Sequence, residues 1–282
     1  MSSEILQDIV CCIGQSLEAN PLQFMMERAF EEADLDWRYL MLEVAPENLG
    51  DAVRGIRAFG FAGATVSTPH KESVLAHLTR LTETARLMGA VNILYREDGD
   101  LVGDNANGRA LLKALRNVAD PAGKVALVLG AGGMGRALAV ELARAGVAKV
   151  ILANRTPERA EALAAVIREE LGVQTEVRQL TKKLDVPEPV DLLVNATAAG
   201  FGEDNARAPI DVKTLRSGMI VADVMFHPLE TRLLEAARAA GCFTITGLDM
   251  LVYQTYESFE RWTGVQTSVE TLREAADEFL TV

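Results

Sequence analysis

The sequence is poor in the residues that build disulfide frameworks, metal centres and membrane spans. Its three cysteines are odd in number and two, Cys11 and Cys12, are adjacent, so we expect no disulfide framework and a reducing cytoplasm. The three histidines share no metal-ligand spacing, so we predict no metal site. No apolar run approaches the roughly eighteen residues that a membrane-spanning helix needs, and the first residues lack a charged-then-apolar leader pattern.

Positive charge is also scarce. Lysine and arginine number 28 against 40 aspartates and glutamates, which gives a formal net charge of −12. This balance argues against nucleic acid or an anionic membrane as a partner, because both bind through a basic face. Local positive groups must therefore attract any anionic ligand. The 282 residues are 49% hydrophobic and 24% charged, which is typical of a globular protein large enough for two domains.

The most informative local motif is VLGAGGMGR, which joins an apolar run at 125–129 to an alanine-rich amphipathic stretch at 135–145. Strand passes into helix at three glycines, and each has a physical reason. Gly130 allows the tight turn, Gly132 lets a pyrophosphate approach the backbone, and Gly135 lets the helix pack closely. The free N–H groups and the dipole of that helix favour phosphate. The pattern predicts a dinucleotide site at Gly130, Ala131, Gly132, Gly133 and Met134.

The next predicted strand, 149–153, ends in Asn154, Arg155 and Thr156. An NAD-binding unit usually has an acidic residue near this point, which accepts hydrogen bonds from the ribose hydroxyls. The chain instead has Arg155 and Arg159, whose guanidinium groups suit a 2′-phosphate. Arginine is unfavourable in the first turn of a helix unless an anion binds there. The sequence therefore predicts NADP as cofactor.

Hydrophobic periodicity predicts an α/β fold with two domains. In the first half we expect strands at 9–13, 37–44, 64–67, 91–95 and 101–102, helices at 24–33, 48–59, 70–78 and 82–87, an Asn48 helix cap and a hairpin turn at 97–99. A helix at 107–118 then leads to strands at 125–129, 149–153, 174–178, 192–196, 220–224 and 243–245, with helices at 135–145, 157–171 and 229–240. This alternation predicts a parallel sheet with helices on both faces. The last helices, 249–262 and 268–279, have no further strand, so we expect them to return to the first domain.

Several separated motifs resemble those of the shikimate dehydrogenase family, along nearly the full length of the chain. They are STPHK (67–71), GAVN (89–92), GDNANG (103–108), GAGGMG, NRT, NATAAG (195–200) and GLDMLVYQ (247–254). The resemblance implies a substrate domain at 1–104 that residues 247–282 complete, and a doubly wound Rossmann domain at 105–246. The active site would lie in the cleft between them. It also implies an NADP-dependent oxidoreductase of the shikimate pathway, which interconverts 3-dehydroshikimate and shikimate. We further assign Thr197, Val224 and Gly247 to the cofactor.

Reduction of a ketone by hydride also needs a proton for the developing alkoxide. Lys71 is the candidate donor, because it follows Pro69 at the carboxyl end of a predicted strand, where open α/β sheets place ligands. Asn107 stands where the family has an aspartate paired with this lysine. An amide can hydrogen-bond the amine but cannot take its proton. We predict Lys71 and Asn107 as catalytic residues, and Asn20, Ser67, Asn92 and Gln254 as substrate-binding residues.

Other positions also depart from the family pattern. The family has a serine pair that binds the substrate carboxylate, and here Asn20 and Leu22 occupy those places. Ser16 could substitute only if the loop shifts, and Phe226 replaces an expected tyrosine. We expect a small anionic cyclic substrate and a monomer or homodimer. Three functions stay open: a shikimate dehydrogenase with an altered pocket, a paralogue for quinate or another cyclic acid, and a binding protein without activity. Lys71 and the complete glycine motif favour the enzymes.

Overall fold

The computed structural model describes residues 6–181, 183–199 and 208–281. The chain divides into two compact units. Unit 1 comprises Met1–Ala106 and Val252–Val282, and unit 2 comprises Asn107–Leu251. Unit 1 is thus assembled from two separate stretches of the chain, whereas unit 2 is continuous.

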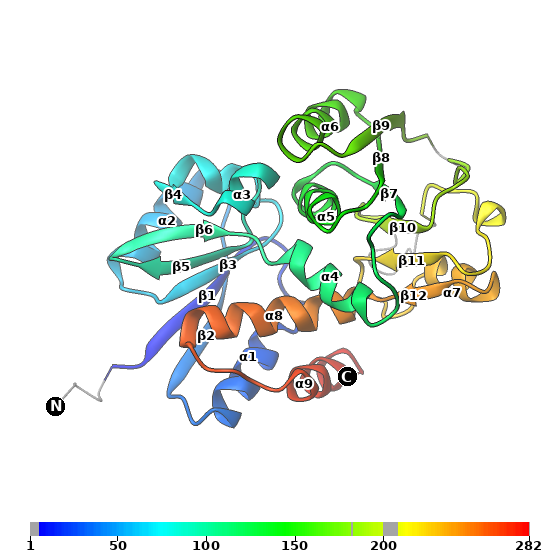
Figure 1. Ribbon diagram of the computed structural model, residues 1–282. Helices are drawn as coiled ribbons and strands as arrows, with labels where there is room; N and C mark the ends of the chain where they lie inside the picture. The colour runs from blue at the N-terminus through cyan, green and yellow to red at the C-terminus, as the bar shows by residue number, and fades with distance from the viewer. Residues whose placement is uncertain (1–5, 182, 200–207, 282) are drawn as a thin grey trace. The chain divides into compact units, whose positions relative to one another are not determined.

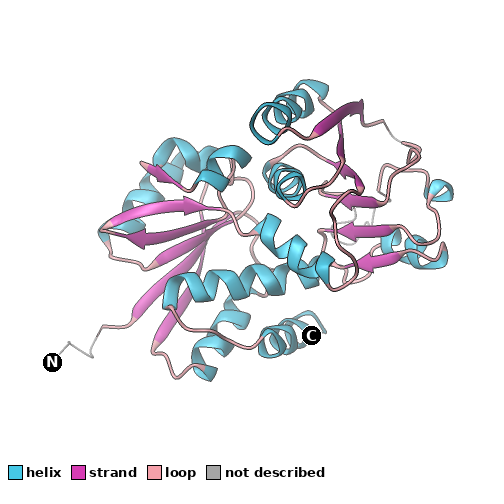
Figure 2. Ribbon diagram, viewed as in Figure 1, coloured by secondary structure: helices cyan, strands magenta, loops and turns pink. Residues whose placement is uncertain are grey.

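Unit 1 is built on a mixed six-stranded sheet of order β2-β1-β3-β5-β6-β4. Strands β1, β2 and β3 are parallel, β5 runs antiparallel to both β3 and β6, and β4 is parallel to β6. The strands fan out within this unit in Figure 2. Their bounds are β1 Asp8–Gly14, β2 Trp37–Glu43, β3 Gly63–Val66, β4 Arg80–Leu81, β5 Ile93–Glu97 and β6 Asp100–Asp104.

Strand alternation gives this sheet two apolar faces, each covered by helices. Cys11, Ile13 and Val66 pack into a core with residues of α2 (Leu49–Ala58), η2 (Ser73–His77) and α3 (Glu83–Met88). On the other face, the Tyr39 ring lies 6.2 Å from that of Trp262, in α8 (Gly247–Thr263). Phe30 of α1 (Leu22–Glu32) contacts Phe259 of the same helix.

The C-terminal helices complete unit 1. The Trp262 indole Nε1 donates a hydrogen bond to the Leu94 carbonyl oxygen over 2.8 Å. Gly63 makes room for this ring, because a Cβ there would lie 2.2 Å from Trp262 Nε1. Helix α9 (Val269–Thr281) packs on α1, where Arg28 pairs with Glu278 at 2.9 Å. The last two helices thus pack on the sheet and on α1 of unit 1.

Unit 2 contains a fully parallel sheet of order β12-β11-β10-β7-β8-β9. Helices α5 and α6 lie on one face and α7 on the other (Figure 1), so the predicted doubly wound sheet is confirmed. The strands are β7 Val125–Leu129, β8 Lys149–Asn154, β9 Gln174–Gln179, β10 Leu192–Asn195, β11 Ile220–Asp223 and β12 Phe243–Ile245; the helices are α4 Asn107–Arg116, α5 Gly133–Arg144, α6 Pro157–Leu171 and α7 Arg232–Ala239.

Three local predictions in unit 1 were wrong. Asn48 makes no side-chain cap, because a 3₁₀ turn, η1 (Pro46–Asn48), precedes α2 and the Asn48 N–H donates to the Ala45 carbonyl. The expected helix at 70–78 is only a 3₁₀ segment at Ser73–His77. The strand expected at 91–95 begins at Ile93, and the short strand β4 was not predicted at all.

The structure also bears on the cysteine and membrane predictions. Cys11, Cys12 and Cys242 are all free thiols. Among the helices of the described ranges, none has both the length and the apolar character to cross a membrane.

Candidate active site

Three of the predicted substrate-side residues meet at one edge of the unit 1 sheet. Ser67 directly follows β3, and the Val66 N–H before it donates to the Asn92 carbonyl oxygen over 2.8 Å. The Val91 N–H in turn donates to the Lys71 carbonyl oxygen, also over 2.8 Å. These backbone bonds hold Ser67, Lys71 and Asn92 next to one another, at the carboxyl end of β3.

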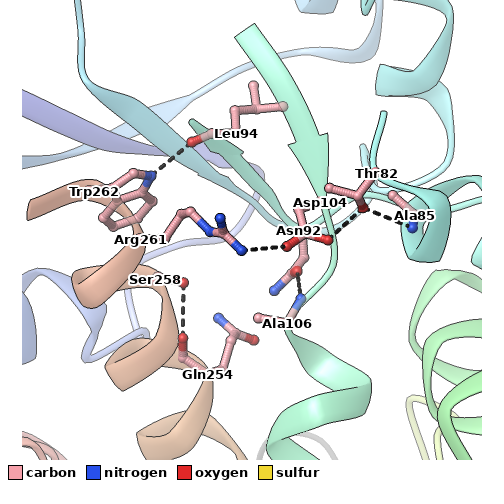
Figure 3. Close-up of polar contacts among 10 residues, drawn as sticks. All are labelled: Thr82, Ala85, Asn92, Leu94, Asp104, Ala106, Gln254, Ser258, Arg261 and Trp262. Carbon is pink, nitrogen blue, oxygen red and sulfur yellow. Dashed lines mark hydrogen bonds and ion pairs between the residues drawn. The ribbon is translucent and has the colours of Figure 1, made fainter. Parts of the chain in front are cut away.

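Two buried amide side chains lie near this edge. Asn92 is 1% exposed, and its Oδ1 accepts a hydrogen bond from the Ala106 N–H over 2.7 Å, which determines how the amide is turned. Gln254, on α8, is 8% exposed. Figure 3 shows its side chain extending from α8 toward that of Asn92.

A buried carboxylate, Asp104, connects α8 to the same strands. It accepts a hydrogen bond from the Thr82 hydroxyl over 2.7 Å and lies 3.9 Å from an Arg261 guanidinium nitrogen (Figure 3). Arg261 also stacks over the Tyr95 ring, 4.7 Å from its centroid. The sequence analysis missed this network. The sequence did hold a signal for this network. Gln254 and Arg261 are seven residues apart, which places both on one face of a helix.

Lys71 is the only lysine in the sequence of unit 1. Its side chain is partly exposed, but protein atoms surround its amino group. This burial lowers the pKa of Lys71 to about 8, against a smaller opposing effect of Cys12. An amine of this pKa is protonated at neutral pH and gives up its proton readily, which suits general acid–base catalysis.

Beneath Lys71 lies a buried cluster that the sequence analysis did not predict. Cys12 on β1 pairs in register with Thr65 on β3, so both side chains point to the same face. The Tyr39 hydroxyl donates to the Thr65 hydroxyl over 2.8 Å. Burial raises the pKa of the Cys12 thiol to about 12, so it stays neutral beside Lys71. The sequence did hold a signal for this cluster. Thr65 and Ser67 are two residues apart, so they point to the same face of the sheet.

The loop between β1 and α1 carries the remaining predicted substrate residue. Asn20 Oδ1 accepts a hydrogen bond from the Leu22 N–H over 3.1 Å. The Leu22 side chain is 2% exposed and belongs to the buried face of α1. Ser16 is exposed and has a positive φ of 55°.

Asn107 is the first residue of α4 in unit 2, and its side chain is buried. Its pairing with Lys71 of unit 1 stays a prediction. The next residue, Gly108, lies against α5, since a Cβ there would be 2.5 Å from the Glu141 Cβ. This close approach fixes the start of α4 on unit 2.

The glycine turn of unit 2 has the geometry that its sequence predicts. Gly130 ends β7 with a φ of 100°, a conformation that favours glycine. A Cβ on Gly135 would lie 2.1 Å from the Gly130 carbonyl oxygen, so a side chain here would force the helix away. Gly132 is the extended residue before α5, and Gly133 and Met134 form its first turn. This turn leaves an open N-terminus that suits a pyrophosphate.

Asn154 connects the glycine turn to the end of β8. Its Oδ1 accepts from the Ala131 N–H over 3.1 Å, and its Nδ2 donates to the Thr156 carbonyl oxygen over 2.8 Å. Arg155 is exposed and makes no ion pair within the part of the chain that the structure describes; Arg159 is exposed in the first turn of α6. Both arginines thus follow the end of β8, the strand that pairs with β7.

The turn lies where the strand order of the sheet reverses, between β7 and β10. Thr197 follows β10, and its methyl group would be 3.4 Å from a Cβ on Gly130. The Thr197 hydroxyl donates to Asn195 Oδ1 over 2.7 Å. Doubly wound sheets bind dinucleotides at this switch point.

Val224 and Gly247 lie together on the neighbouring strand end. The Val224 N–H donates to the Asn195 carbonyl oxygen, and a Cβ on Gly247 would be 2.6 Å from the Val224 carbonyl oxygen. Beside them, Asp223 accepts from the Thr231 hydroxyl over 2.8 Å. Burial raises the pKa of this carboxyl, while its hydrogen bonds oppose the shift. The sequence analysis gave Asp223 no role, and its hydrogen bonds hold the segment that follows Val224.

A doubly wound sheet with a glycine turn at its switch point, and a separate unit that carries a desolvated lysine, define a dinucleotide-dependent oxidoreductase. No group of histidine, cysteine and acidic side chains in the described ranges could hold a metal ion. The comparisons with known proteins identify the family. Three family models match: "Shikimate dehydrogenase substrate binding domain" at residues 13–94, "Shikimate / quinate 5-dehydrogenase" at 113–202 and "Shikimate 5'-dehydrogenase C-terminal domain" at 247–276.

The chain belongs to the shikimate dehydrogenase family. It is 38% identical over 281 residues to the NADP(+) shikimate dehydrogenase of Methanopyrus kandleri, and the match covers 97% of this chain and 96% of the relative. Ligand-free 5-ketofructose reductase of Gluconobacter sp. strain CHM43 is similar in structure, with a TM-score of 0.90, 38% identity and coverage of 97% and 99%. Shikimate 5-dehydrogenase of Thermus thermophilus in complex with NADP(H) and shikimate has a TM-score of 0.86, 33% identity and coverage of 97% and 100%.

Proposed function

We propose that this protein is an NADP-dependent oxidoreductase that interconverts a ketone and a secondary alcohol on a small polyhydroxylated substrate. The observation that carries the proposal is Lys71. Its desolvated amine lies at the same sheet edge as Ser67 and Asn92. The complete glycine turn of the same chain supports the cofactor assignment, and Arg155 with Arg159 supports the phosphorylated form.

In this proposal each residue has a distinct task. Bound NADPH supplies a hydride to the carbonyl carbon of the ketone. The Lys71 ammonium gives its proton to the carbonyl oxygen, and in the reverse direction the free amine takes that proton back. Ser67, Asn92 and Gln254 bind and orient substrate hydroxyl groups. Asn154 holds the glycine turn, while Arg155 and Arg159 bind the 2′-phosphate.

The relatives suggest two substrates to test. The first is the 3-dehydroshikimate and shikimate pair, because curated relatives such as that of Methanopyrus kandleri are NADP-dependent shikimate dehydrogenases. The second is 5-ketofructose, because the structurally similar Gluconobacter protein is a reductase of this ketose. The change of NADPH absorbance should be followed with 3-dehydroshikimate, 5-ketofructose, shikimate and quinate. Turnover of at least one compound supports the proposal, and turnover of none, with NADPH binding intact, contradicts it.

Asn107 distinguishes an altered shikimate dehydrogenase from an enzyme for another substrate. If the pocket still serves shikimate, Asn107→Asp should place a carboxylate near Lys71, raise the pKa of the lysine and increase activity on shikimate by about tenfold. If Asn107 itself binds another substrate, the change should lower activity on that substrate. Parallel assays of the variant on both substrates decide between the two outcomes.

We also infer action in a reducing compartment such as the cytoplasm, as a monomer or homodimer that binds no nucleic acid. Three free thiols and a net charge of −12 support this setting. Size-exclusion chromatography with light scattering tests the oligomeric state.

A further inference from the structure

We propose that the substrate is an uncharged polyhydroxylated ketone rather than a carboxylate, and that Asn20 is a specificity-determining residue for it. The proposal rests on the proposed function and names its substrate class. It comes from the loop at residues 15–21, which joins β1 to α1.

This loop borders the edge that carries Ser67 and Lys71. The Gln15 N–H donates to the Thr68 carbonyl oxygen over 2.9 Å. A Cβ on Gly14, just before the loop, would lie 2.8 Å from the Ser67 Cβ. A substrate held by Ser67 and protonated by Lys71 therefore has the loop as one of its walls.

The charge of this wall is negative. Glu18 is the only ionisable residue of the loop. A second carboxylate, that of Glu43, reaches the loop from the end of β2 and accepts the Leu17 N–H over 2.9 Å. Lys71 is the only lysine of unit 1, and the proposed reaction uses it at the ketone. A substrate carboxylate beside the loop would therefore find no cation in the loop itself, and the Glu43 carboxylate bound to the loop would repel it.

The neutral groups of the loop also favour a hydroxyl over a carboxylate. Leu22 offers no polar atom and is buried in unit 1. Asn20 Oδ1 is used by the Leu22 N–H, and within the described ranges its Nδ2 has no protein acceptor. This single amide N–H can satisfy a hydroxyl oxygen, whereas a carboxylate has two oxygens that both need donors. Ser67, Asn92 and Gln254 are neutral as well, so every predicted substrate contact other than Lys71 fits a hydroxyl.

The test compares an uncharged ketose with an acid on the same holoenzyme. The readouts are kcat/KM for 5-ketofructose and 3-dehydroshikimate with NADPH, and calorimetric Kd values for the same two ketones on the enzyme saturated with oxidised NADP, with which neither ketone can react. We expect kcat/KM to favour the ketose by about a hundredfold, the order of discrimination that one unsatisfied buried polar or charged group brings. We expect the Kd values to follow the same order.

Variants connect this preference to the loop. Asn20→Ser should raise kcat/KM for 3-dehydroshikimate and lower it for 5-ketofructose, each by about tenfold, because a hydroxyl group replaces the amide. Gln23→Ser, at the exposed neighbouring position on α1, is the matched control and should change neither value. Circular dichroism checks that each variant is folded.

The proposal is overturned if the wild-type protein binds or converts the acid as well as the ketose, or if it binds neither compound. The calorimetric Kd values decide between the ketose and the acid even when neither compound is turned over. Absence of turnover alone contradicts the proposed function, and the order of the Kd values still tests the substrate class.

Discussion

At the scale of single residues, the main chemical feature is a lysine whose acidity comes from burial. Cys12 near the amine remains a neutral thiol, because burial raises its pKa to about 12. Desolvation of the ammonium is thus the largest cause of the lowered pKa of Lys71. A catalytic acid can be prepared in this way without a charged partner, since the enclosing protein disfavours the charged form of the amine.

Replacement of Lys71 by alanine should separate chemistry from cofactor binding. Without the amine no group protonates the alkoxide, so kcat should fall by about a hundredfold or more. The Kd of NADPH should not change, because Lys71 belongs to unit 1 and the glycine turn to unit 2. Stopped-flow turnover and fluorescence titration measure the two quantities. An active Lys71→Ala protein would exclude the mechanism.

The pH dependence should have opposite signs in the two directions. Ketone reduction uses the Lys71 ammonium, so its rate should fall as the pH rises through about 8, the lowered pKa of this group. Alcohol oxidation uses the free amine, so its rate should rise through the same pH. Lys71→Arg is the control, because a guanidinium stays protonated and should abolish this transition. Initial rates over a pH series in constant-ionic-strength buffers provide the measurement.

Arg155 should determine the preference for NADP over NAD. It is exposed beside the glycine turn and has no ion-pair partner in the described part of the chain. Its loss should cost on the order of 2 kcal/mol of NADP binding, the range of a charged hydrogen bond, and almost nothing for NAD. Titration of both cofactors into Arg155→Ala measures the difference. Equal losses for the two cofactors would argue against the assignment.

At the scale of elements, the docking of α8 on the unit 1 sheet is the contact most open to a test. Trp262→Phe keeps an aromatic ring beside Tyr39 but removes the indole N–H that donates to the Leu94 carbonyl oxygen. Loss of this buried hydrogen bond should lower the free energy of unfolding by about 1 kcal/mol. Trp37→Phe is the matched control, since among the described residues the Trp37 indole has no acceptor comparable to the Leu94 carbonyl oxygen. Urea unfolding monitored by circular dichroism compares the two variants, and equal losses would contradict the role of the Trp262 bond.

The same scale shows what the sequence could predict and what it could not. The buried parallel strands of unit 2 alternate with long helices, so hydrophobic periodicity was sufficient to predict these elements. In unit 1 an α-helix was predicted at 70–78, but only a 3₁₀ segment forms there, at Ser73–His77. The His70 ring at its start contacts the Val44 carbonyl oxygen at 2.7 Å, a distant contact that the local sequence does not reveal. Strand β4 has only two residues and therefore no detectable period.

The candidate site was predictable only where a motif is local. STPHK and GAGGMG located Lys71 and the glycine turn without the structure. The cluster of Cys12, Tyr39 and Thr65 depends on the pairing of three strands that lie far apart in the chain. The ion pair of Asp104 with Arg261 likewise joins distant segments. Local patterns carry no information about such pairings.

At the scale of the whole molecule, unit 1 depends on a segment that follows unit 2 in the chain. Removal of residues 252–282 would take away Trp262, Phe259 and all of α9 and expose the apolar face that they cover. We expect unit 1 of such a truncated protein to be unfolded, while unit 2 still binds NADPH with a Kd within about threefold, since its own contacts are complete. Proteolysis followed by mass spectrometry should show rapid cleavage within 1–106 and protection within 107–251. Equal protection of both regions would contradict the dependence.

The placement of the aromatic residues makes the two units optically distinct. Both tryptophans, Trp37 and Trp262, belong to unit 1, and the sequence of unit 2 contains none. Indole emission of the cofactor-free protein therefore reports the folding of unit 1, while the directly excited emission of bound reduced nicotinamide reports unit 2. Two melting experiments, one without and one with NADPH, can thus follow the two units separately without any introduced dye.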